Sequence, residues 1–206
     1  MKSVKQVSGN AFPLNRADVD TDQIIPKQFL KRIERTGYGE FAFFDWRKDD
    51  DFIINQPDYA GAPIMLAQQN FGCGSSREHA VWALDDMGIE AVIAPSFGDI
   101  FRNNSSKVGL LTIQLPQEDV DYLMSRAEEL PSSEIKIDLQ AQTVSVGAEW
   151  TRQFEIDPFA KHRLLNGLDD IGLTLENEDD ISGFESKRDA LKPDTTPALE
   201  SATKMG

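Results

Sequence analysis

The chain has 206 residues, of which 40% are hydrophobic and 27% are charged, and its formal net charge at pH 7 is −14. This length suits one domain with a sizeable core and appendages. The acidic charge argues against nucleic acid or an anionic membrane as the main partner, because both require a basic protein surface.

The single cysteine, Cys73, excludes an internal disulfide and is compatible with a reducing compartment. It also excludes a self-contained iron–sulfur cluster, which takes several cysteine ligands. No apolar run is long enough to span a bilayer, and the first residues lack the apolar core of a signal peptide. We therefore expect a cytoplasmic protein.

The first part of the chain, residues 9–26, mixes turn-forming residues with acids. The cluster Asp20-Thr21-Asp22 suggests a calcium loop, but the glycine and the glutamate that an EF-hand requires do not follow at the right offsets. We favour side chains that bond the local backbone in turns. Pro26 then predicts the first position of a short helix that reaches Ile33.

Residues 34–47 are rich in glycine and in aromatic side chains, and they also carry basic residues. Two interpretations stay open for this segment. It is a flexible loop that closes over a ligand, since loops often carry binding residues, or it is an aromatic cluster that fills a satellite core.

The central stretch, residues 64–88, predicts a strand, a sharp turn and a helix. Ile64–Ala67 has the length and character of a buried strand, and Gly72 and Gly74 permit backbone angles that other residues resist. Ser75 or Ser76 is a good helix N-cap.

Glu78, three residues after Ser75, completes the pattern of a capping box, and Met87-Gly88 predicts the end of the helix. The turn thus presents two hydroxyls and the guanidinium of Arg77 at a helix N-terminus, where an anion is favoured.

The chain then alternates between buried strands and helices. The expected elements are a strand at 89–95, a short helix that ends at Gly109, a strand at 110–115 and an amphipathic helix at 118–130. A strand, a helix and a strand within about thirty residues predict a parallel pair with a right-handed crossover.

From residue 134 the hydrophobic period changes to two, which predicts an antiparallel meander through residue 156 with a turn near Gly147. Helices are expected at 157–165 and 168–175. We expect one domain over residues 1–176 and an acidic, disordered tail over residues 177–206.

The turn does not match several familiar glycine motifs. It lacks the lysine of a P-loop, the closing glycine of a nucleophile elbow and the third glycine of a dinucleotide fingerprint. A Cys73 nucleophile with His79 as its base is disfavoured, because no second histidine stands nearby to support the pair.

The residues of the turn also have purely structural interpretations, which stay open from the sequence alone. The Ser75 hydroxyl would cap the helix, Arg77 would form a surface or interface ion pair, and His79 would pack beside Trp82. The alternative is binding of a carboxylate, since an arginine beside a serine can hold it through two hydrogen bonds.

Residues 70–80, Asn-Phe-Gly-Cys-Gly-Ser-Ser-Arg-Glu-His-Ala, resemble the signature of the swivelling domain of the aconitase superfamily. The resemblance is closest to the 3-isopropylmalate dehydratase small subunits of bacterial leucine biosynthesis. Further segments agree with that family: 20–26, the loop from Gly37 to Arg47, 96–101 with Asn103-Asn104, and 157–159. The resemblance covers residues 9 to about 175 and leaves the acidic tail outside it.

This resemblance implies an α/β swivelling domain with β/β/α layers and a mixed sheet, followed by C-terminal helices. It implies that Ser75, as alkoxide, is the base that removes the proton beside a carboxylate, while Ser76 and Arg77 bind the substrate carboxylate. In the family, the loop over residues 35–47 distinguishes the substituent of the substrate, with Arg35 and Thr36 as the candidate contacts.

The resemblance also implies an obligatory partner, a large subunit that carries a [4Fe-4S] cluster, and no metal bound by this chain. The implied reaction is the dehydration of 2-isopropylmalate to isopropylmaleate and its rehydration to 3-isopropylmalate. Two alternatives stay open: a related hydro-lyase of the citraconate or homoaconitate type, and a non-catalytic module that binds carboxylates.

Overall fold

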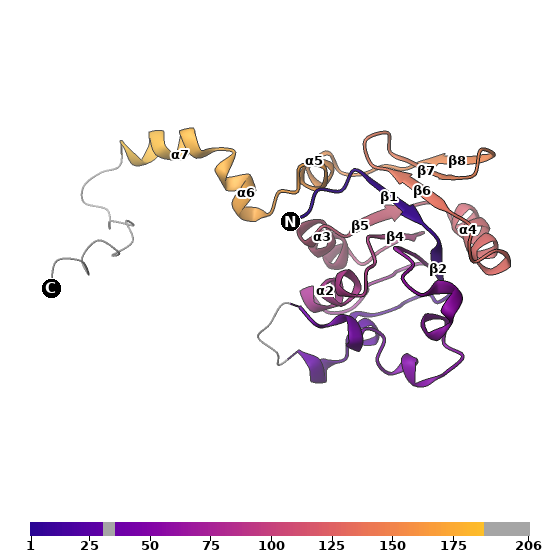
Figure 1. Ribbon diagram of the computed structural model, residues 1–206. Helices are drawn as coiled ribbons and strands as arrows, with labels where there is room; N and C mark the ends of the chain where they lie inside the picture. Colours follow the sequence, from indigo (N-terminus) through magenta and orange to yellow (C-terminus); the bar gives the residue numbers. More distant parts are fainter. Residues whose placement is uncertain (31–35, 188–206) are drawn as a thin grey trace, which may run out of the picture. The chain divides into compact units, whose positions relative to one another are not determined.

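The computed structural model describes residues 1–30 and 36–187, and it separates into two units, residues 1–170 and residues 171–206. The first unit contains two four-stranded sheets (Figure 1). One is antiparallel in the order β1-β6-β7-β8 and consists of Gln6–Gly9, Ile135–Asp138, Thr143–Val146 and Trp150–Gln153. The other is parallel in the order β2-β3-β4-β5 and consists of Ala11–Leu14, Ile64–Ala67, Ala91–Ala94 and Leu111–Gln114.

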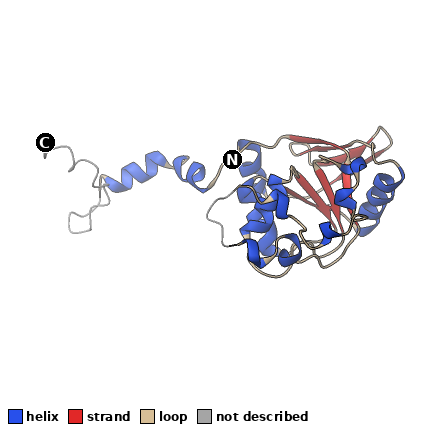
Figure 2. Ribbon diagram, turned by 60° about the horizontal axis from the view of Figure 1, so that its bottom comes forward, coloured by secondary structure: helices blue, strands red, loops and turns tan. Residues whose placement is uncertain are grey.

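Four α-helices of the first unit, α1 to α4, lie in the connections between these strands, and α5 follows the last strand (Figure 2). They are α1 (Thr21–Ile24), α2 (Glu78–Asp86), α3 (Asp99–Val108), α4 (Gln117–Glu129) and α5 (Pro158–Asn166). Short 3-10 helices fill the long connection between β2 and β3, at Lys27–Phe29, Gly39–Phe41, Trp46–Lys48, Ile53–Asn55 and Pro57–Tyr59.

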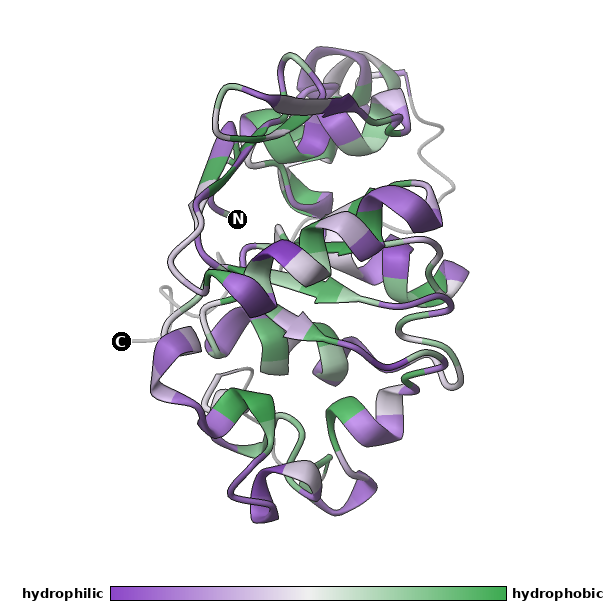
Figure 3. Ribbon diagram, turned by 90° about the vertical axis from the view of Figure 1, so that its right-hand side faces the viewer, coloured by the Kyte–Doolittle hydropathy of each residue, from purple (hydrophilic) through white to green (hydrophobic). Residues whose placement is uncertain are grey.

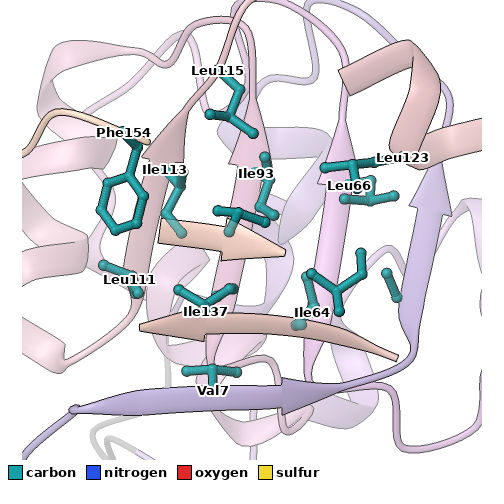
Figure 4. Packing of buried hydrophobic residues seen from close by; sticks show 14 of the residues in the cluster. Val7, Ile64, Leu66, Ile93, Leu111, Ile113, Leu115, Leu123, Ile137 and Phe154 are labelled. Atoms are coloured by element: carbon teal, nitrogen blue, oxygen red, sulfur yellow. The ribbon is translucent and has the colours of Figure 1, made fainter. Parts of the chain in front are cut away.

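The parallel sheet separates two hydrophobic cores, because successive side chains of a strand point to opposite faces. Leu66 and Ile93 pack in the core shared with the antiparallel sheet and α4 (Figure 4). Met65 and Val92 pack in the other core, shared with α2 and α3. Figure 3 shows the apolar residues concentrated on the strands in the middle of this unit.

This arrangement of antiparallel sheet, parallel sheet and helices confirms the expected β/β/α layers. The expected mixed sheet is wrong for the described residues, because the parallel and antiparallel pairings are divided between two sheets. The parallel pair from β3 and β4 and the meander from β6 to β8 also match the expectation. Gly109 and Gly167 adopt left-handed backbone angles at the ends of α3 and α5.

Other parts of the first unit differ from the expectation. The predicted helix from Pro26 to Ile33 is wrong over its described part, where one 3-10 turn, Lys27–Phe29, follows Pro26. The segment after it contributes to the core, since Tyr38 and Phe43 are fully buried. The aromatic-cluster interpretation therefore holds for these two residues.

In the second unit, the structure describes residues 171–187. Helix α6 (Asp170–Leu175) begins at the boundary between the units, and α7 (Glu178–Glu185) follows it. The sequence predicts disorder where α7 lies. Among the described residues no helix has the length and apolar character needed to cross a membrane.

Candidate active site

The candidate site lies where the parallel strands end, at the carboxyl edge where α/β sheets usually bind their ligands. The loop after β2 is joined to the loop after β3 by backbone hydrogen bonds. The Gly72 amide donates to the Val19 carbonyl at 2.8 Å, and the Thr21 amide donates to the Cys73 carbonyl at 3.0 Å. The turn from residue 71 to 77 is therefore fixed against α1.

The loop after β4 supports the same turn from its other side. The Gly98 amide donates to the Phe71 carbonyl at 2.9 Å, and the Phe71 and Phe101 rings meet edge to face with centroids 5.3 Å apart. Gly72 has φ +72°, and a Cβ there would lie 2.3 Å from Cγ of Phe101. This position therefore requires glycine for both its backbone angle and its space.

The serines of the turn do not cap the helix. Helix α2 begins at Glu78, its N-cap is Arg77, and the Arg77 side chain makes no capping hydrogen bond. The capping box predicted from Ser75 and Glu78 is therefore wrong. Ser75 and Ser76 are both exposed, and no hydrogen bond of either hydroxyl is found among the described residues.

The backbone of Ser75 is held in place, although its hydroxyl has no hydrogen bond within residues 1–30 and 36–187. Its carbonyl oxygen accepts hydrogen bonds from the Arg77 amide at 2.9 Å and from Oγ1 of Thr21 at 3.2 Å. The turn therefore presents an exposed hydroxyl on a fixed backbone, beside the open N-terminus of α2.

Arg77 is the charged residue of the site. Its Nη1 donates to Oδ1 of Asp22, and its side chain is only 12% exposed. The hydrogen bond from Arg77 lowers the pKa of the Asp22 carboxyl, against the opposing effect of burial. The pairing of Asp22 with Arg77 was not predicted from the sequence, although Asp22 lies in one of the segments that carry the family resemblance.

The geometry does not favour a cysteine nucleophile. Burial raises the pKa of the Cys73 thiol, and the charges of Asp20 and Asp18 raise it further. His79 packs against Trp82 and Tyr38 with ring centroids 4.7 and 5.3 Å away, as its structural interpretation predicts. Burial lowers the pKa of His79.

The remaining predicted contacts lie in the segment before the 3-10 helix Gly39–Phe41. Thr36 is exposed, and Arg35 lies outside the described residues. The segment that follows is attached to α2, since the Tyr38 amide donates to Oδ2 of Asp86 at 2.8 Å. Arg47, which sequence reasoning left without a role, binds the carbonyls of Ala42 and Gly39 at 2.6 and 3.0 Å.

Of the two acids that suggested a calcium loop, Asp20 has a local partner, whereas Asp22 binds Arg77, 55 residues further along the chain. Oδ1 of Asp20 accepts a hydrogen bond from the Gln23 amide at 2.8 Å, and Oε1 of Gln23 accepts one from the Asp20 amide at 2.9 Å. This capping box starts α1, so Asp20 supports a turn as expected. In the described part of the chain, no group of three or more His, Cys, Asp or Glu residues is placed to hold a metal ion.

Comparisons with known proteins agree with this geometry. The family model of the aconitase C-terminal domain matches residues 1–118. A second family model, which describes the C-terminal domain of 3-isopropylmalate dehydratase small subunits, matches residues 170–197. The second match corrects the expectation that the resemblance ends near residue 175, because it extends into the acidic tail.

Curated relatives that match nearly the whole chain are 3-isopropylmalate dehydratase small subunits. That of Rubrobacter xylanophilus is 55% identical over 94% of this chain and 98% of its own, and that of Acidobacterium capsulatum is 52% identical over 92% of both chains. A solved 3-isopropylmalate dehydratase structure from Methanocaldococcus jannaschii has a TM-score of 0.64 and 27% identity, covering 86% of this chain and 98% of that one.

The two layered sheets and the turn at their edge define a domain of the aconitase C-terminal class. Within that class, the chain belongs to the family of 3-isopropylmalate dehydratase small subunits.

Proposed function

We propose that this chain is the small subunit of isopropylmalate isomerase. Together with a large subunit, it converts 2-isopropylmalate to 3-isopropylmalate, by dehydration to isopropylmaleate and rehydration. The observation that carries this proposal is the turn at residues 74–77. It places two exposed serines next to Arg77, and among the described residues neither serine hydroxyl has a hydrogen-bond partner. The small subunits of 3-isopropylmalate dehydratase from two bacteria match nearly the whole chain, which supports the proposal.

In this reaction Ser75 is the base that removes a proton from the carbon beside a carboxylate, and it returns a proton during rehydration. Arg77 and Ser76 bind that carboxylate. A serine hydroxyl is a weak acid, so an alkoxide requires a positive field. The open N-terminus of α2 and the Arg77 guanidinium contribute to such a field. Arg35 and Thr36 stay candidate contacts for the isopropyl substituent.

The [4Fe-4S] cluster of this enzyme belongs to the large subunit in our proposal. This chain does not fit the cluster, because its one cysteine, Cys73, cannot supply the ligands that a cluster takes. On the partner, the cluster acts as a Lewis acid for the hydroxyl of the substrate. A cytoplasmic location of the complex stays a prediction.

The test is reconstitution with a purified large subunit that carries its cluster. We expect isopropylmaleate absorbance to change when 2-isopropylmalate is added to the mixture, and to stay constant with either protein alone. Activity of this chain alone would contradict the proposal of a shared site.

The same assay distinguishes the neighbouring substrates. A panel of hydroxy diacids with isopropyl, methyl and carboxyalkyl substituents reports which substituent the complex prefers, and we expect isopropyl. Preference for a methyl or a longer acidic substituent would instead assign the chain to a citraconate or homoaconitate hydro-lyase. If the chain were a carboxylate-binding module, calorimetry would detect binding to the isolated chain.

A further inference from the structure

We propose that Asp22 is the positioning residue of Arg77. It binds Nη1 of the guanidinium and thereby leaves the opposite edge, Nε and Nη2, free and correctly oriented for the carboxylate of the substrate. This inference rests on the proposed function and adds to it a residue from a different loop.

The Arg77 guanidinium has one charged partner. Its Nη1 donates to Oδ1 of Asp22, and no other hydrogen bond of the Arg77 side chain is found among the described residues. A guanidinium binds a carboxylate with two parallel hydrogen bonds along one edge. Asp22 uses a single nitrogen, and among the described residues no hydrogen-bond partner is found for Nε and Nη2, which form one edge of the guanidinium.

Asp22 is itself held firmly by its helix. It lies in the first turn of α1, which the capping box of Asp20 and Gln23 starts. The hydrogen bond from the Thr21 amide to the Cys73 carbonyl joins α1 to the turn that carries Arg77. Both partners of the ion pair are therefore attached to one fixed piece of backbone.

The order of the Arg77 side chain before binding affects the free energy cost of binding a ligand. An arginine side chain has many rotamers, and fixing it when a ligand binds reduces the affinity. The Arg77 side chain is 12% exposed and already has one charged partner, so most of its freedom is lost before the substrate arrives. Lys27, whose Nζ lies 3.8 Å from Oδ2 of Asp22, partly offsets the negative charge of this partner.

The opposite interpretation is that Asp22 competes with the substrate for Arg77. The two interpretations predict opposite changes of KM when the carboxylate is removed. A competing carboxylate would have to leave Arg77, so its removal would lower KM. A positioning carboxylate stays in place, so its removal raises KM.

The first experiment measures kcat and KM of the reconstituted complex with Asp22→Ala and Asp22→Asn. We expect Asp22→Ala to raise KM for 2-isopropylmalate about tenfold or more, because a misplaced binding group weakens the complex, with a smaller effect on kcat. Asp22→Asn keeps an acceptor for Nη1 and should recover part of the loss. An unchanged or lowered KM in Asp22→Ala would overturn the inference.

Glu134→Gln is the matched control, because it removes the carboxylate of an exposed ion pair with Lys136 on β6, 3.4 Å long. It should leave KM unchanged. Thermal unfolding and the mass of the complex verify that each variant folds and assembles. If the wild-type complex does not convert 2-isopropylmalate, the proposed function fails independently of these variants.

The second experiment needs neither substrate nor partner. Nitrogen-15 relaxation of the Arg77 Nε–H group in the isolated full chain reports how well the side chain is ordered. We expect an ordered group in the wild type and a mobile one in Asp22→Ala. Equal mobility in the two proteins would overturn the positioning role even if the substrate assignment were wrong.

Discussion

The ion pair between Arg77 and Asp22 changes the pKa of the Asp22 carboxyl, which can be measured. The hydrogen bond from Arg77 lowers the pKa of Asp22, while burial of the carboxyl raises it. Asp22 is therefore ionised throughout the range in which most enzymes work. Ser75 and Ser76 beside it are exposed, as their proposed role in binding the substrate requires.

Replacement of Arg77 tests this account of the pKa. In Arg77→Met the opposing effect of burial remains, so the pKa of Asp22 should rise and no longer lie below that of an ordinary aspartate. Carbon-13 NMR of the carboxyl groups during an acid titration measures this change. Asp138 is an internal control, because its pKa is lowered mainly by the Ala141 amide and should not move. An unchanged pKa of Asp22 would contradict the pairing.

The same shift predicts the sign of a pH effect on stability. A carboxyl whose pKa is lower in the folded state stabilises the fold above its unfolded pKa, and this contribution is lost as the pH falls through the folded pKa. The difference in unfolding free energy between wild type and Arg77→Met should therefore shrink below about pH 4. Denaturant unfolding at pH 7 and pH 3 measures it, and a difference that grows in acid would contradict the prediction.

Among the elements, the turn before α2 depends on a glycine at position 72. Gly72 lies against Phe101 and has φ +72°, whereas Gly61 has a similar φ of +74° with no atom within 4 Å of an added Cβ. Substitution of either glycine by alanine lowers the free energy of unfolding by about 1–2 kcal/mol, because the residue must keep a left-handed backbone conformation. Gly72→Ala alone also meets the clash with the ring.

We expect Gly72→Ala to lower the free energy of unfolding by about 1–3 kcal/mol more than Gly61→Ala, the cost typical of overpacking a core. Denaturant unfolding of the two variants measures the difference. Equal destabilisation would mean that the packing of Phe101 against the turn is not needed.

The elements also show which sequence signals are reliable. The strand Ile64–Ala67, the meander from β6 to β8 and the helix that ends at Gly109 were predictable, because their hydrophobic periods and end signals are local. Strand β2 was not, since it contains Pro13. A proline is tolerated there because β2 is an edge strand that pairs only with β3.

The cap of α2 was mispredicted for a different reason. Ser75 and Glu78 match a capping box, but the loop after β2 holds the Ser75 carbonyl and the Arg77 side chain, and α2 starts later. Such contacts come from residues about fifty positions away in the chain. The Ser-Ser-Arg triplet could be recognised as a candidate site from the sequence, because its residues are adjacent in the chain. The pairing of Arg77 with Asp22 could be recognised only in the fold.

At the scale of the whole molecule, the cores belong to the first unit. All residues in the two hydrophobic clusters lie between Met1 and Leu165. The second unit begins at residue 171, and its large apolar side chains Ile171, Leu175, Ile181 and Phe184 are exposed. Since both clusters lie within the first unit, a chain that ends after residue 176 should keep a cooperative unfolding transition. Thermal unfolding measures this, and a loss of cooperative unfolding would show that the tail supports the core.

The central claim is that this chain contributes the base to a site completed by a cluster-bearing large subunit. The most direct measurement is the turnover of 2-isopropylmalate by that complex with Ser75→Ala, beside Ser8→Ala, which changes an exposed serine of β1. We predict that Ser75→Ala assembles normally and loses about 10²–10⁴-fold in kcat, the contribution typical of a positioned base, while Ser8→Ala is unaffected. Near full turnover in an assembled Ser75→Ala complex would contradict the claim.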